Sequence, residues 1–212
     1  MGKNHGWRGI ISSSTVMSFA LMGDALIYAI LPIYATEFGL TLPMVGIILS
    51  INRFVRVFAY GLISHYVALI GLRKMCFIAA MLATFSTAIY GYSTGFFPIF
   101  LARIIWGIAY AILVLITLAY AIEFKERTGA RVGVSQTIQR FGPIFSLLVG
   151  SWMVGMVGPK MVFLLMTIPT SIGILIALYL PKHSLTFKTS FKDNHNLSKP
   201  TSLDLLFFIQ GY

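Results

Sequence analysis

The chain has 212 residues, of which 58% are hydrophobic and only 10% charged, with a formal net charge of +10. A water-soluble domain usually carries about 25% charged residues, so this chain is too apolar for a surface in water and the bilayer is its expected solvent. The basic residues form no basic helix or aromatic-basic patch, which excludes nucleic acid as an expected partner.

Six apolar runs follow one another along the chain, near residues 10–35, 43–69, 72–93, 96–121, 132–157 and 160–180. A helix needs about 20 mostly apolar residues to span a bilayer, so each run predicts one spanning helix. The first run follows Lys3 and Arg8 but is too long for the apolar region of a signal peptide. We therefore predict an all-α membrane protein whose residues 1–181 form a six-helix unit.

The composition changes after Pro181. Residues 182–201 are polar and basic, which predicts a cytoplasmic linker, and residues 202–212 start a new apolar run. Ten or so residues cannot cross a bilayer. We interpret the chain as a truncated product or fragment that contains only the start of a seventh spanning helix.

Basic residues in short loops indicate which side of the membrane is cytoplasmic. With a cytoplasmic N-terminus, the only basic residue in the outside loops is Lys160. Eleven basic residues then lie inside, namely Lys3, Arg8, Arg73, Lys74, Lys125, Arg127, Arg131, Lys182, Lys188, Lys192 and Lys199. We expect a multi-pass protein of the bacterial inner (plasma) membrane with its N-terminus in the cytoplasm.

Four arginines and one aspartate lie within the predicted spans, namely Arg53, Arg56, Arg103, Arg140 and Asp24. An arginine at the bilayer centre costs roughly 2.5–3.5 kcal/mol on insertion scales. Asp24 and Arg53 each lie about eleven residues, roughly 16 Å, from the predicted outer ends of consecutive antiparallel helices. We expect these two residues to form an ion pair, which either fixes the packing or takes part in binding or proton coupling.

Two short segments occur twice in the same order. "SINRFVRVF" (50–58) in the second predicted helix matches "TIQRFGPIF" (137–145) in the fifth, and "YAIL" occurs at 28–31 and 110–113 in the first and fourth. These matches predict two three-helix repeats, and the odd number of spans inverts the second repeat in the membrane. Transporters commonly bind their substrates near the midplane, between such repeats.

The candidate substrate-binding or coupling residues are the polar side chains of these helices. They are Asp24, Tyr28, Asn52, Arg53, Arg56, Arg103, Tyr110, Gln139 and Arg140. No nucleotide-binding or hydrolase motif is present, and the histidines have no metal-ligand spacing. We therefore expect no enzymatic activity, no cofactor and no metal.

The chain resembles the N-terminal half of a major facilitator superfamily transporter over residues 10–181. The family's fourth-helix motif R-x-x-x-G matches Arg103 to Gly107, and Gly142-Pro143 matches the core of its antiporter motif. The signature between helices 2 and 3 is altered, with His65 in place of the aspartate. The resemblance implies alternating access, in which this half moves against a second six-helix half or another copy of itself.

Two functions remain open at this point. One is secondary transport of a small solute. The excess of arginine over aspartate in the spans is balanced either by carboxylates of a second six-helix half or by an anionic solute. The other is a non-transporting fragment or scaffold that associates with other membrane chains.

Overall fold

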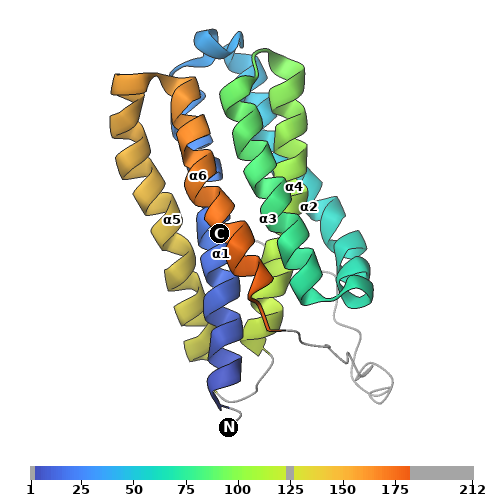
Figure 1. Cartoon of the computed structure of the whole chain (residues 1–212). Helices are drawn as coiled ribbons and strands as arrows, with labels where there is room; N and C mark the ends of the chain where they lie inside the picture. The colour runs from blue at the N-terminus through green and yellow to red at the C-terminus, as the bar shows by residue number, and fades with distance from the viewer. Residues whose placement is uncertain (1–2, 123–126, 182–212) are drawn as a thin grey trace.

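The computed structural model describes residues 3–122 and 127–181, which form six long α-helices and one short 3-10 helix (Figure 1). The α-helices are α1 (Lys3–Ile30), α2 (Leu42–Ile70), α3 (Leu72–Tyr92), α4 (Phe96–Ile122), α5 (Thr128–Val157) and α6 (Pro159–Leu178). Each is long and apolar enough to cross a membrane, which confirms the predicted all-helical fold. The predicted linker and seventh helix lie outside the described residues.

The helix ends agree with the sequence to within a few residues, except in α1. This helix begins at Lys3 and ends at Ile30, whereas the apolar run predicted 10–35. Its end lies two residues before Pro32, which cannot donate a backbone hydrogen bond to a continuing helix. The chain then forms the 3-10 helix η1 (Ala35–Phe38), which ends at Gly39 in the left-handed conformation.

The helices do not pack in chain order. α1 packs mainly along α5, and α2 packs along α4, while α1 and α2 make almost no contact. α3 packs against α4 and α6, and α6 also packs against α1. When α1, α2 and α3 of the first repeat are matched with α4, α5 and α6 of the second, the α1–α5 contact corresponds to the α4–α2 contact. In the same way, the α1–α6 contact corresponds to the α4–α3 contact. The main helix contacts therefore follow the predicted pair of three-helix repeats.

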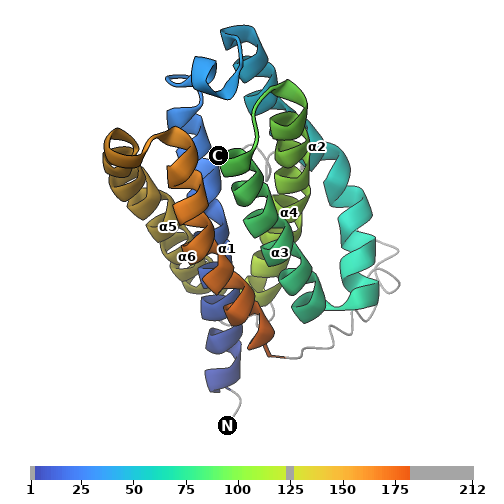
Figure 2. The ribbon, with the colours of Figure 1, turned by 45° about the horizontal axis from the view of Figure 1, so that its top comes forward.

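α2 and α5 lie on opposite sides of the bundle, as both ribbon views show (Figures 1 and 2). In the most apolar stretch of each helix, 22% of the residues are buried, against 67% in α1. α1 and α4 are covered by their neighbours, whereas α2 and α5 keep a wide open face. A charged side chain on these two helices can therefore be either buried or exposed, depending on its direction.

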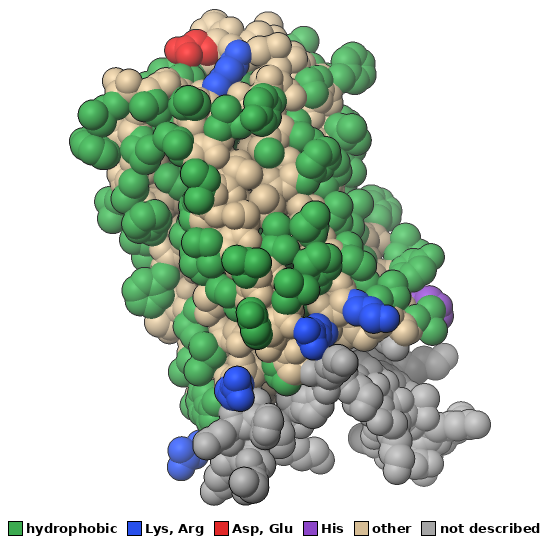
Figure 3. Space-filling view, in the orientation of Figure 1, with side chains coloured by type: hydrophobic (Ala, Val, Ile, Leu, Met, Phe, Trp, Pro, Cys, Tyr) green, Lys and Arg blue, Asp and Glu red, His purple; other side chains and the backbone are tan. Residues whose placement is uncertain are grey.

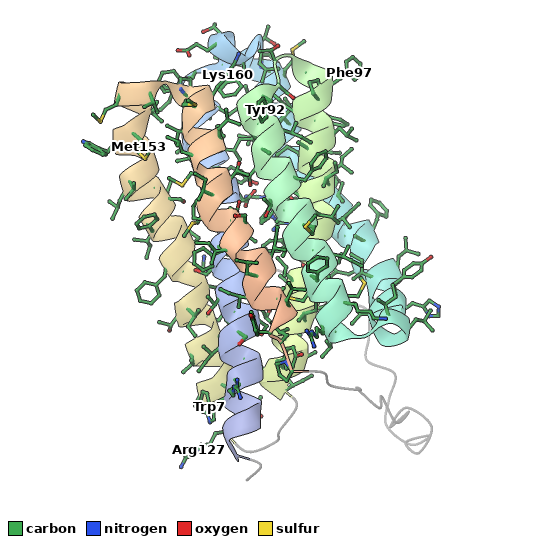
Figure 4. The ribbon with its side chains drawn as sticks, viewed as in Figure 1. Trp7, Tyr92, Phe97, Arg127, Met153 and Lys160 are labelled. Carbon is green, nitrogen blue, oxygen red and sulfur yellow. The ribbon has the colours of Figure 1, made fainter. Side chains whose placement is uncertain are left out.

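The face of the bundle drawn in Figure 3 carries hydrophobic side chains along its height. Large side chains such as Phe58, Phe97 and Trp152 are mostly exposed, and lipid chains are their natural surroundings. Figure 3 shows lysine and arginine side chains gathered near one end of the bundle. In Figure 4, Trp7 and Arg127 lie at that end, and Lys160 lies at the other. The protein is thus a multi-pass integral membrane protein.

Candidate functional site

An ion pair joins α1 to α4 inside the bundle. Asp24 Oδ1 accepts a hydrogen bond from Arg103 Nη1 at 2.5 Å. Arg103 is fully buried, and Asp24 is 9% exposed. A buried charge is stable only when it is paired and hydrogen-bonded, so each of these residues depends on the other.

The predicted pair of Asp24 with Arg53 is wrong. Because α1 ends at Ile30, Asp24 lies six residues, about 9 Å, from that end of its helix. Arg103 lies seven residues from the start of α4, whereas Arg53 lies eleven residues from the start of α2. Depth in the membrane therefore matches Asp24 to Arg103. The prediction also took consecutive helices as neighbours, but α4 lies beside α1 and α2 does not.

The surroundings of the ion pair come from α1 itself and from two further helices, α2 and α3. The Arg103 guanidinium lies over the ring of Tyr28 in α1, with 4.8 Å from its central carbon to the ring centroid. Tyr28 Oη donates a long hydrogen bond of 3.4 Å to the Leu49 carbonyl in α2. On α3, Thr87 fills the space beside Gly23. Among the described residues, Arg103 Nε and Nη2 have no hydrogen-bond partner.

A second arginine lies where α2 crosses α4. Arg56 Nε donates to Asn52 Oδ1 at 3.0 Å, one turn earlier in the same helix. The guanidinium covers the ring of Tyr110 in α4, with its central carbon 3.5 Å from the ring centroid. Asn52 is fully buried beside Gly107, at a point where the two helices approach closely. The side chain of Arg56 is thus held by two neutral partners.

A third polar cluster joins α1 to α5. Ser14 and Ser135 share a hydrogen bond of 2.7 Å, and Gln139 Nε2 donates to Ser135 Oγ at 2.9 Å. Further along, Gly142 N donates to Ser18 Oγ at 2.8 Å. The sequence analysis missed the three serines. The sequence signal for this cluster was a four-residue spacing on both helices, Ser14 and Ser18 on α1 and Ser135 and Gln139 on α5. This spacing places each pair on one face of its helix.

The two repeats place equivalent residues alike. Asn52 and Gln139, which occupy the same position in the repeated segment, are both buried, and the arginines that follow them, Arg53 and Arg140, are both exposed. Tyr28 lies under the guanidinium of Arg103, and its counterpart Tyr110 lies under Arg56. The repeat therefore extends to side-chain environment.

The structure places the nine predicted residues in three sets of contacts, apart from Arg53 and Arg140, which are exposed. Asp24 and Arg103 form the ion pair, and the ring of Tyr28 lies against Arg103. Three more form the cluster of Asn52, Arg56 and Tyr110, and Gln139 belongs to the α1–α5 contact. A pocket at the opposite end from the N-terminus, lined by Glu37 and Lys160 among others, includes none of the nine. No group of His, Cys, Asp or Glu in the described segments could hold a metal ion.

Comparison with curated proteins finds no match. A family model described as Major Facilitator Superfamily matches residues 14–209, a range that includes all six helices except the first turns of α1. Together with the six membrane spans and their paired packing, this match shows that the chain belongs to the Major Facilitator Superfamily of membrane transporters.

Proposed function

We propose that the chain takes part in secondary active transport of a small solute by alternating access. In this mechanism the six-helix bundle moves as one body against a second six-helix half, or against another copy of itself. Membership of the superfamily supports transport in general. The packing of the two three-helix units around α1 and α4 supports a bundle that moves as one body.

The single observation that carries the proposal is the burial of ionisable side chains within the spans. Such residues are costly in a membrane and usually mark a substrate or ion pathway. Arg103 uses one of its terminal nitrogens on Asp24 and leaves Nε and Nη2 unpaired among the described residues. A bundle that needed only packing would be as stable with apolar side chains at these positions.

We further propose that the solute carries a negative charge. Asp24 is the one acidic residue within the six helices as described, and it already binds Arg103. Arg53 and Arg56 therefore add positive charge that no carboxylate of these helices offsets. A guanidinium suits the geometry of carboxylate or phosphate groups, so an anionic solute would supply the missing charge.

A test of transport needs the purified chain in liposomes with an imposed pH gradient. We expect labelled benzoate to accumulate faster than in empty liposomes, and the accumulation to stop when an uncoupler removes the gradient. Glucose and choline, as neutral and cationic probes, should enter no faster than in empty liposomes. If no probe enters faster than the control, the alternative of a non-transporting scaffold is favoured. Its support is the open, Arg53-bearing face of α2, which suits contact with another membrane chain.

The proposed orientation places the N-terminus and residues 182–201 in the cytoplasm. Cys76 is the single cysteine of the chain, so Cys76→Ala gives a background without thiols. On this background, Thr41→Cys and Val157→Cys should react with a membrane-impermeant maleimide in intact bacterial cells. Lys74→Cys should react only after the cells are opened. Labelling of Lys74→Cys alone in intact cells would reverse the proposed topology.

A further inference from the structure

We propose that Arg56 is a preformed binding site for a carboxylate group, located where α2 crosses α4. The inference rests on the proposed transport function and names the part of the solute that this chain recognises. The site consists of the Arg56 guanidinium, the ring of Tyr110 beneath it and the Asn52 side chain that holds it. The hydrogen bond and the ring contact of Arg56 involve neither Asp24 nor Arg103.

The first argument is the direction of the hydrogen bonds of Arg56. Its Nε is occupied by Asn52, and one face of the guanidinium is covered by Tyr110. The side chain is half-buried, and no described residue accepts a hydrogen bond from its two terminal Nη nitrogens. These two nitrogens are the edge of the guanidinium that binds a carboxylate with two parallel hydrogen bonds. The fixed contacts therefore leave the binding edge available.

The second argument is charge. Both described partners of Arg56 are neutral, and within residues 3–122 and 127–181 no carboxylate lies within salt-bridge distance of it. Tyr60, one turn further along α2, is close enough to interact electrostatically with Arg56 and Tyr110, and it is neutral as well. A guanidinium in this setting is stabilised when an anion binds. A carboxylate carries one negative charge, which balances the single positive charge of the Arg56 guanidinium.

The third argument is depth, which decides the source of the anion. Arg56 is fourteen residues from each end of α2, Leu42 and Ile70, or about 21 Å along the helix in both directions. The apolar core of a bilayer is about 30 Å thick, so this arginine lies near its middle. Lipid phosphates lie at the two surfaces and do not reach that depth. Depth therefore favours a small solute over a lipid headgroup as the source of the carboxylate.

The orientation of Arg56 is set by the buried amide below it. Asn52 is fully buried against α4, with its carbonyl oxygen toward Arg56 and its Nδ2 without a described partner. In the second repeat, Gln139 holds the same position, but Pro143 stands where Arg56 stands in the first. The repeat thus provides a buried amide in both units and the binding arginine in one. We infer that the carboxylate site is present once in this bundle.

The experiment measures binding of labelled benzoate to the purified chain in phosphatidylcholine nanodiscs, with empty nanodiscs subtracted. Benzoate should bind, and the neutral analogue benzamide should not compete. Arg56→Gln should weaken benzoate binding by at least about tenfold, because a charge-assisted pair of hydrogen bonds is lost. Arg56→Lys should weaken it less, since it keeps the charge and loses the two-point geometry. Arg8→Gln, an exposed arginine at the end of α1, is the charge-matched control and should bind as the unchanged chain does.

Several outcomes would overturn the site. They are unchanged binding in both Arg56 variants, an equal loss in Arg53→Gln, which would mean that total charge decides, and equal competition by benzamide. Inorganic phosphate competing better than benzoate would assign the site to phosphate, and competition by phosphatidylglycerol nanodiscs would assign it to lipid. Arg56→Lys keeps the test valid if Arg56→Gln does not fold. Benzoate binding without uptake in liposomes would refute transport and keep the site. Benzoate uptake that is unchanged in the Arg56 variants would support transport and refute the site.

Discussion

Removing either member of the Asp24–Arg103 pair is expected to lower the free energy of unfolding by about 3–5 kcal/mol, the usual cost of leaving one partner of a buried pair alone. Arg103 is fully buried between α1 and α4, so without Asp24 its charge has no described carboxylate in reach. Asp24→Asn and Arg103→Gln keep the size of the side chains nearly constant. The measurement is unfolding of the purified chain by a denaturing detergent, followed by helical circular dichroism.

The double variant distinguishes a coupled pair from two separate defects. Asp24→Asn with Arg103→Gln should be more stable than the sum of the single effects by about 1–3 kcal/mol, because neither charge is left unpaired. Asp24→Asn with Arg53→Gln is the matched control, since Arg53 is exposed on α2 and does not contact Asp24. Its effects should add. Strict additivity in the Arg103 pair, or coupling in the Arg53 pair, would contradict the observed contact.

The six spans were predictable because the signal is local. A run of about 20 apolar residues spans the bilayer whatever its neighbours are, and the predicted starts and ends agree with α2, α3, α4 and α6 within one or two residues. α1 shows the limit of that signal. The apolar run continues through Leu31 and Ile33, but Pro32 stops the hydrogen bonding of the helix before it.

The partner of Asp24 was not predictable from the same information. Four arginines with the same chemistry were available, and choosing among them required knowing which helices touch. The chain connects α1 to α2 yet packs α1 against α5 and α4. Tertiary packing, not the order of the helices, therefore decides the ion pair. The five-residue error in the end of α1 also shifted the apparent depth of Asp24 toward that of Arg53.

The repeat carried more information than its short length suggested. The matched segments correctly indicated equivalent positions, as the buried amides Asn52 and Gln139 show. They did not indicate that the arginines beside them face outward. Successive residues of a helix point about 100° apart, and only the packing of α2 on α4 and of α5 on α1 sets which of the two points inward.

The closest approach of α1 and α5 gives the second large effect that we expect. A Cβ atom added to Gly142 would lie 1.9 Å from the backbone oxygen of Ser18 and 2.6 Å from its carbonyl carbon. Backbone atoms within a helix cannot move aside as a flexible side chain does. Gly142→Ala should therefore push the two helices apart and cost about 1–3 kcal/mol or more, the range for inserting atoms into a packed interior. Denaturing-detergent unfolding again provides the measurement.

Other glycines of α5 provide controls with the same chemical change. At Gly150, an added Cβ would meet the end of the Leu26 side chain at 2.5 Å, which can turn away, whereas at Gly133 it would meet nothing within 4 Å. Alanine favours helix over glycine by about 1 kcal/mol when nothing interferes. We expect Gly133→Ala to be neutral or stabilising, Gly150→Ala to be mildly destabilising and Gly142→Ala to be the least stable. Adding Ser18→Gly should not rescue Gly142→Ala, because the clash is with the backbone of Ser18. Equal stability of the Gly142→Ala and Gly133→Ala variants would show that α1 and α5 are farther apart than this contact requires. The Gly142–Ser18 hydrogen bond would then no longer explain how α5 is held against α1.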